Sequence, residues 1–167
     1  MVQAAVSKTP PSTSNATFGP GPTFANNIGF DIGVSEDKKA FTATFSGLDA
    51  IIDGRSASPV ASRTFSFCIP LSGADSYEEI PFFVSGFAVS EKGANAHLMI
   101  TVNDQTSVTD FPANSDGSFV QRLNYKPGAA AEARITVFLL ADRDSKSDAG
   151  VQVIVNAIDT DILKHTN

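Results

Sequence analysis

Three aspartates lie close together in the segment ADRDSKSDAG, between the apolar runs RITVFLL and VQVIV. Calcium takes about six to eight oxygen ligands, which closely spaced carboxylates and backbone carbonyls can supply. Asp142, Asp144 and Asp148 are therefore candidate calcium ligands. No glutamate follows at the EF-hand distance, and Arg143 and Lys146 can neutralise the carboxylates without a metal. We favour a polar turn between two strands, keep calcium as the alternative, and predict no other cofactor.

Groups that could catalyse a reaction are few. The sequence contains two histidines, His97 and His165, and one cysteine, Cys68. Cys68 lies within a predicted strand, away from the helix start that favours a thiolate, and no G-x-S-x-G elbow is present. Glu78 and Glu79 are adjacent, and adjacent strand residues point to opposite faces. We therefore predict that the protein is not an enzyme, and we name no catalytic residue.

The charge and the aromatic composition exclude several kinds of partner. The net charge of −6 and the pI of about 4.7 leave no basic surface for phosphates, so neither nucleic acid nor an anionic membrane is a predicted partner. No apolar run reaches the roughly 20 residues that a membrane-spanning helix needs. Phenylalanine occurs 13 times, against two tyrosines and no tryptophan. This composition places most aromatic surface in a core and weakens the case for stacking on a sugar.

The N-terminal residues 1–27 are rich in serine, threonine, proline, glycine and asparagine. Such a segment buries too little apolar surface to fold alone. We predict a flexible or exchanged arm over 1–27, docked along the body or onto a neighbouring subunit through Val2, Val6, Phe18 and Phe24. A β-sandwich domain is predicted over 28–160 and a C-terminal tail over 161–167, and no signal peptide is visible in the chain.

From residue 28 onward, short apolar runs alternate with turn residues, a pattern typical of an all-β sandwich or barrel. In the predicted second strand, Phe41, Ala43 and Phe45 alternate with polar residues, which predicts one buried face. The predicted fold is an antiparallel β-sandwich, jelly-roll-like or immunoglobulin-like. Its eight predicted strands are 28–34, 40–47, 62–71, 80–90, 95–103, 117–125, 133–141 and 150–158.

The run VSEDKKAFTATFSGLDAII, the later SRTFSFCIPL and the following GFAVSEKGANAHLMI resemble a family of small secreted β-rich proteins of unknown function, found in fungi and bacteria. The resemblance covers about residues 30–105. Phe30 stands where that family has a cysteine, so its usual disulfide is missing here. The resemblance implies secretion and a β-sandwich. The residues that match the family pattern are Ser35, Asp37, Phe41, Thr42, Phe45, Arg63 and Cys68.

Two functions remain open from the sequence. The leading hypothesis is a non-enzymatic structural or interaction protein, a self-assembling surface, filament or shell subunit whose arm adds a strand to a neighbour's sheet edge. Its partners would be further copies of the chain or related subunits. The alternative is a calcium-dependent carbohydrate- or ligand-binding module of a secreted protein, with calcium in the predicted end loops 104–117 and 142–149. Both hypotheses place the protein outside the cell or at its surface.

Overall fold

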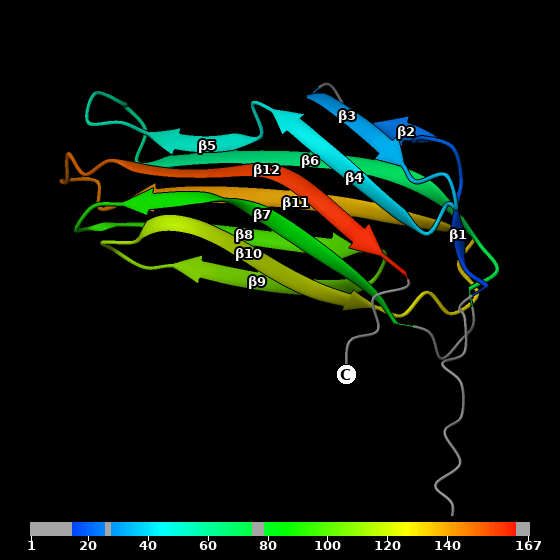
Figure 1. The fold of residues 1–167 in the computed structure, drawn as a ribbon. Helices are drawn as coiled ribbons and strands as arrows, with labels where there is room; N and C mark the ends of the chain where they lie inside the picture. Colours follow the sequence, from blue (N-terminus) through cyan, green and yellow to red (C-terminus); the bar gives the residue numbers. More distant parts are fainter. Residues whose placement is uncertain (1–14, 26–27, 75–78, 163–167) are drawn as a thin grey trace, which may run out of the picture.

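The computed structural model describes residues 15–25, 28–74 and 79–162. Two antiparallel sheets pack face to face, and the strands of each run roughly along the long axis of the molecule (Figure 1). The predicted antiparallel β-sandwich is therefore confirmed. None of the described segments forms a helix long and apolar enough to cross a bilayer.

The first sheet has the strand order β1-β6-β11-β8-β9, with β2 also paired to β6. Its long members, β6 and β11, pair over eleven positions from Glu132 opposite Pro70 to Asp142 opposite Val60. The bounds of its strands are β1 Thr17–Phe18, β2 Phe24–Ala25, β6 Val60–Ser72, β8 Ala94–Val102, β9 Gln105–Phe111 and β11 Glu132–Arg143.

The second sheet has the order β10-β7-β12-β4-β3, and β5 pairs with β12 beyond the end of β4. Strands β7 and β12 form its centre (Figure 1). The bounds of its strands are β3 Gly29–Val34, β4 Ala40–Ser46, β5 Asp49–Ile52, β7 Ile80–Ser90, β10 Asp116–Tyr125 and β12 Val151–Asp161.

Alternation along each strand decides which residues enter the core. In β8 every second residue is fully buried, including Leu98, Ile100 and Val102, while the residues between them, such as His97 and Met99, are only half-buried. Because successive side chains in a strand point to opposite faces, β8 lines the core with one face and the molecular surface with the other. The same pattern holds in β11 and β12.

Each of the eight predicted ranges contains a strand, and the described residues form four further strands that the sequence pattern did not predict. Strand β9 replaces most of the predicted end loop 104–117. Its sequence QTSVTDF has only two large apolar residues, Val108 and Phe111, so hydrophobic periodicity gives little signal. Strand β9 lies at the edge of its sheet and, within the described part of the chain, pairs with a strand on one side only. Polar side chains are tolerated there because the other side is not paired within the sheet. Strand β5 was missed because it has only four residues.

Phe41 of β4 lies at the centre of an aromatic cluster between the sheets. Its ring centroid is 6.1 Å from that of Phe67 on the opposite sheet and 6.0 Å from that of Phe82 on its own, both with edge contacts. Phe18 of β1 approaches it most closely, at 4.9 Å. Edge-to-face pairs of this kind add about 0.5–1.5 kcal/mol each beyond the area they bury.

Gly86 of β7 fits a place that no larger residue could occupy. A Cβ atom there would lie 2.0 Å from the carbonyl oxygen of Ile154 and 2.6 Å from the Phe119 ring. The neighbouring strand β12 has a register shift at this level, between Val155 and Ala157. Glycine therefore permits the close approach of backbone and ring that accompanies the irregularity.

Candidate functional site

Two features could serve function, and the first is the docking of the N-terminal segment, defined here as residues 15–25. Ala16 and Phe18 are fully buried, and both belong to the hydrophobic core. Strand β1 pairs with the end of β6, where Thr17 lies opposite Ser72 and Phe18 opposite Leu71. The sandwich therefore begins before residue 28, and part of the predicted arm supplies core residues of its own chain.

The N-terminal segment contacts both sheets. On the first sheet, the backbone N–H of Gly19 donates to the carbonyl of Pro70 at 2.8 Å. Toward the second sheet, the N–H of Phe18 donates to the carbonyl of Lys38 at 2.8 Å, in the turn between β3 and β4. The Lys39 ammonium donates in return to the carbonyl of Ala16. The segment thus closes one end of the sandwich.

A Gly-Pro-Gly-Pro sequence separates β1 from β2. Proline has no N–H to donate to a ladder, which is why the pairing with β6 is interrupted here. Gly21 has a φ of 73°, a left-handed conformation that favours glycine. Pairing resumes where the N–H of Thr23 donates to the carbonyl of Cys68 at 2.9 Å, and Phe24 lies opposite Cys68 in β2. Val2 and Val6 lie outside the described residues.

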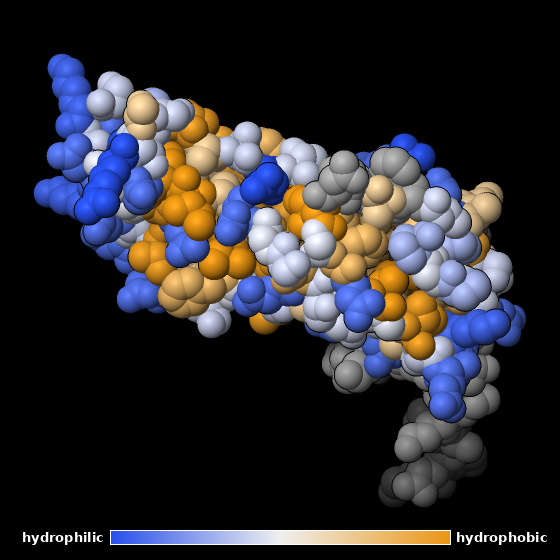
Figure 2. Space-filling model, turned by 90° about the horizontal axis from the view of Figure 1, so that it is seen from above, coloured by the Kyte–Doolittle hydropathy of each residue, from blue (hydrophilic) through white to orange (hydrophobic). Residues whose placement is uncertain are grey.

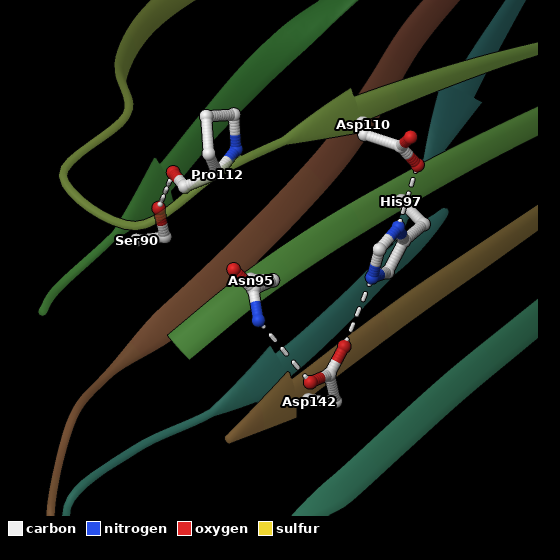
Figure 3. Close-up of polar contacts among 6 residues, drawn as sticks. All are labelled: Ser90, Asn95, His97, Asp110, Pro112 and Asp142. Atoms are coloured by element: carbon white, nitrogen blue, oxygen red, sulfur yellow. Dashed lines mark hydrogen bonds and ion pairs between the residues drawn. The ribbon is translucent and has the colours of Figure 1, made fainter. Parts of the chain in front are cut away.

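The second feature is the polar cluster, defined as Asn95, His97, Asp110 and Asp142, on the outer face of the first sheet (Figure 3). Three neighbouring strands supply it, because Asp110 of β9 lies opposite His97 of β8, and Asp142 of β11 lies opposite Asn95. The His97 ring bridges the carboxylates, with Nδ1 2.7 Å from Asp110 and Nε2 3.0 Å from Asp142. The Asn95 amide donates to Asp142 at 3.5 Å.

The neighbouring turn fixes the end of β9 that carries Asp110. The Ser90 hydroxyl donates to the carbonyl of Pro112 at 2.6 Å (Figure 3), and it accepts the N–H of Ser115 at 3.2 Å. Ser90 is the last residue of β7 and is buried at 3% exposure. Its hydrogen bonds therefore tie the turn after β9 to the other sheet.

The two carboxylates determine the charge state of His97. The hydrogen bond that His97 makes to the Asp110 carboxylate is the largest influence and raises the pKa of His97 above its usual 6.5, while partial burial lowers it and Asp142 raises it further. The His97 side chain is 34% exposed, so water screens the attraction. The arrangement stabilises an imidazolium between two anions on the surface of the sheet.

Apolar side chains border the polar cluster. Leu140 lies opposite His97, and in the next row Phe138, Met99 and Val108 lie side by side across β11, β8 and β9. Val108 is 58% exposed and the other three are half-buried. This face therefore offers carboxylate and amide groups next to a strip of apolar surface.

The predicted calcium ligands are not brought together, and the described residues contain no group of three or more His, Cys, Asp or Glu side chains that could hold a metal ion. Asp142 faces His97, and Asp144 accepts the N–H of Lys146 at 3.0 Å within its own turn. Asp148 instead lines a hollow of about 470 Å³ with Asp53 and Glu91.

A cation of the chain itself occupies the carbonyl oxygens around this loop. The Arg143 guanidinium donates to the carbonyls of Asp53 at 3.0 Å, Ser56 at 2.6 Å and Ala149 at 3.2 Å. Backbone carbonyls are also what a calcium loop would supply, so Arg143 performs the bridging that the prediction assigned to a metal. ADRDSKSDAG is the end of β11 followed by a turn, in line with the favoured interpretation, and its three aspartates do not converge on one point in the described residues.

The remaining reactive side chains occupy separate places. Cys68 is a free thiol of β6 with 2% exposure. Glu79 forms an ion pair with Lys126 at 3.0 Å. Glu78 and His165 lie outside the described residues.

No family model matches the sequence, and no curated protein matches it. Among solved structures, TmCBM61 in complex with β-1,4-galactotriose has a TM-score of 0.39 at 10% identity, over 87% of this chain and 88% of that one. The enzymatically active domain of bacteriophage CBA120 tailspike protein 4 has a TM-score of 0.38 at 13% identity, over 86% of this chain and 19% of that one.

A third structure is the virus-like particle of the extra small virus of the giant freshwater prawn Macrobrachium rosenbergii, with a TM-score of 0.20 at 13% identity over 96% of this chain and 95% of that one. Similarity at this level assigns no function to the chain.

Sequence reasoning found His97 and Asp142 separately but not the polar cluster. The alternation of residues in β8 turns His97 to the outer face. Asp110 was missed because β9 was not predicted, and without that strand nothing brings Asp110 beside His97. The pattern of threonines in QTSVTDF is the signal that could have indicated a strand.

We predict that His97 titrates above pH 6.5 in the folded protein, and that Asp110→Asn and Asp142→Asn each lower its midpoint, because both carboxylates raise the pKa of the ring. NMR titration of the ring resonances measures both. Because the folded pKa is raised, the stabilisation by His97 is fully present below pH 6.5 and is lost as the pH rises through the folded pKa. A midpoint at or below 6.5 would contradict this electrostatic account.

Proposed function

We propose that the protein is a non-enzymatic interaction protein that assembles with further copies of itself through its N-terminal segment. Ala16 and Phe18 belong to an extended segment that adds to β6, and both are buried there. Their burial is the observation that carries this proposal. Addition of an extended segment to a sheet edge is a recurrent way for one chain to bind another. The proposal includes an extracellular or cell-surface location, which the resemblance to secreted β-rich proteins implies.

The distribution of exposed apolar residues favours assembly through the N-terminal segment over assembly through a broad face of the sandwich. The large hydrophobic side chains that are exposed among the described residues come from four different strands. Figure 2, which views the side that carries β3 and β5, shows hydrophobic surface in patches separated by polar groups. A broad interface between faces would favour one continuous patch. The exposed residues are Ile51, Val60, Val108 and Val120.

We predict that the intact chain sediments as an oligomer and that Phe18→Ala shifts it toward the monomer, because the anchor of the segment is lost. Val120→Ala, at a position with 68% exposure, is the matched control and should leave the oligomer unchanged. Analytical ultracentrifugation measures the mass, and circular dichroism at the same concentration verifies that each variant is folded. An intact chain that is monomeric up to the highest soluble concentration would refute the proposal.

The polar cluster favours a second candidate function, the binding of a carbohydrate on the outer face of the first sheet. Sugar hydroxyls donate to carboxylates and accept from amides, and the cluster offers both beside the apolar side chains of Leu140 and Met99. The apolar strip would pack against the C–H face of a sugar ring. The site uses Asp110 and Asp142, which fall within the ranges of the predicted calcium loops, but it joins them through His97 and requires no metal.

We predict that the intact protein binds at least one glycan on a glycan array. Asp110→Ala should abolish this binding, because it removes one carboxylate of the polar cluster. Asp116→Ala, in the exposed part of β10, controls for the loss of a negative charge. Failure to retain any glycan, or equal loss in both variants, would rule out this second function.

A further inference from the structure

We propose that the N-terminal segment is exchangeable, so that residues 15–25 of one copy dock on a second copy of the chain in place of its own segment. This inference rests on the proposed function and names the surface that performs it. The docking site is defined as residues 38–41 and 67–73, which provide the backbone and aromatic contacts described above.

The docking site is built to receive an added strand. Without the segment, the stretch of β6 from Phe67 to Ser72 would lack its partner on one side, since β11 pairs only with the other. The Phe41 ring would also lose its nearest aromatic neighbour, Phe18. An open edge beside uncovered apolar surface favours pairing with another extended chain.

The fit restricts which chain can dock. A Cβ atom on Gly19 would lie 2.7 Å from the Pro70 ring, so the docking site requires glycine directly after the phenylalanine anchor. On the opposite side, a Cβ on Gly73 would lie 2.5 Å from the carbonyl oxygen of Asn15. The occupant that matches these constraints is the sequence Asn-Ala-Thr-Phe-Gly of the chain itself, and a second copy carries the same sequence.

Exchange costs little in contacts, because each hydrogen bond and ring contact made within one chain is made again between two. The free energy that separates the two arrangements is then mainly the entropy of joining the copies, which concentration offsets. A chain whose segment enters its neighbour leaves its own docking site free for a third copy. Repetition of this step gives a closed ring or a filament.

A disulfide between two separately tagged copies tests the exchange. The hydroxyl oxygens of Thr17 and Ser72 are 3.0 Å apart, so cysteines at these positions lie side by side when the segment is docked. One copy carries Thr17→Cys and the other Ser72→Cys, both with Cys68→Ala to remove the native thiol. After co-expression and mild oxidation, we expect a disulfide-linked dimer that contains both tags and that a reductant dissolves.

Two controls make either result decisive. The double variant Thr17→Cys/Ser72→Cys in one chain shows that the pair can close. Replacing Ser72→Cys by Val120→Cys, an exposed position on the other sheet, measures random collision. If the two-tag dimer does not exceed that background while the double variant closes, the exchange is refuted. An oligomer that sediments normally but gives no such dimer refutes the exchange alone, and the Phe18→Ala variant then decides whether assembly still depends on the N-terminal segment.

Discussion

The contact between the Phe18 and Phe41 rings is the interaction on which the sandwich depends at its N-terminal end. Phe41 comes from β4 of one sheet, and it touches Phe67 of the other sheet and Phe18 of the short strand β1. Phe18 is therefore shared by both layers, although it lies in a segment of low hydrophobic content. A core that depends on Phe18 is complete only while the N-terminal segment is docked.

The outer faces are free to vary because the inner faces carry the packing. In β8 the buried residues Leu98 and Ile100 hold the strand in place, and the residues between them face the surface at no cost to the core. This is how His97 comes to lie between Asp110 and Asp142, whose strands flank β8. The same scaffold thus positions a polar cluster on one sheet and completes its core with an edge segment.

The amino-acid pattern predicts most of the sandwich but little of the two sites. Strands with apolar residues at every second position, such as β8, are predictable because this period indicates one buried face. Strand β9 was not predicted, because an edge strand with polar side chains on both faces lacks that period. Without β9, the place of Asp110 beside His97 could not be predicted either. Local composition also placed Phe18 in an arm, since the aromatic partner that makes it a core residue, Phe41, is distant in the sequence.

The aspartates of ADRDSKSDAG show the limit of sequence spacing as a signal. Their spacing suggested a shared ligand, yet strand geometry turns Asp142 to the sheet face, where it meets His97. Arg143 is the next residue along β11, and alternation points its side chain to the other face. There its guanidinium donates to the carbonyls of Asp53, Ser56 and Ala149. Spacing in sequence indicates proximity of the backbone, whereas the direction of each side chain follows from the pleat.

A double-mutant cycle with Phe18→Leu and Phe41→Leu tests the central claim most directly, with urea unfolding as the measurement. If the two rings form the contact that closes the sandwich, the free-energy costs of the two substitutions are not additive, and the coupling is about 0.5–1.5 kcal/mol in favour of the pair. Additive costs, with no coupling beyond experimental error, would contradict the account, because Phe18 would then be buried without supporting Phe41.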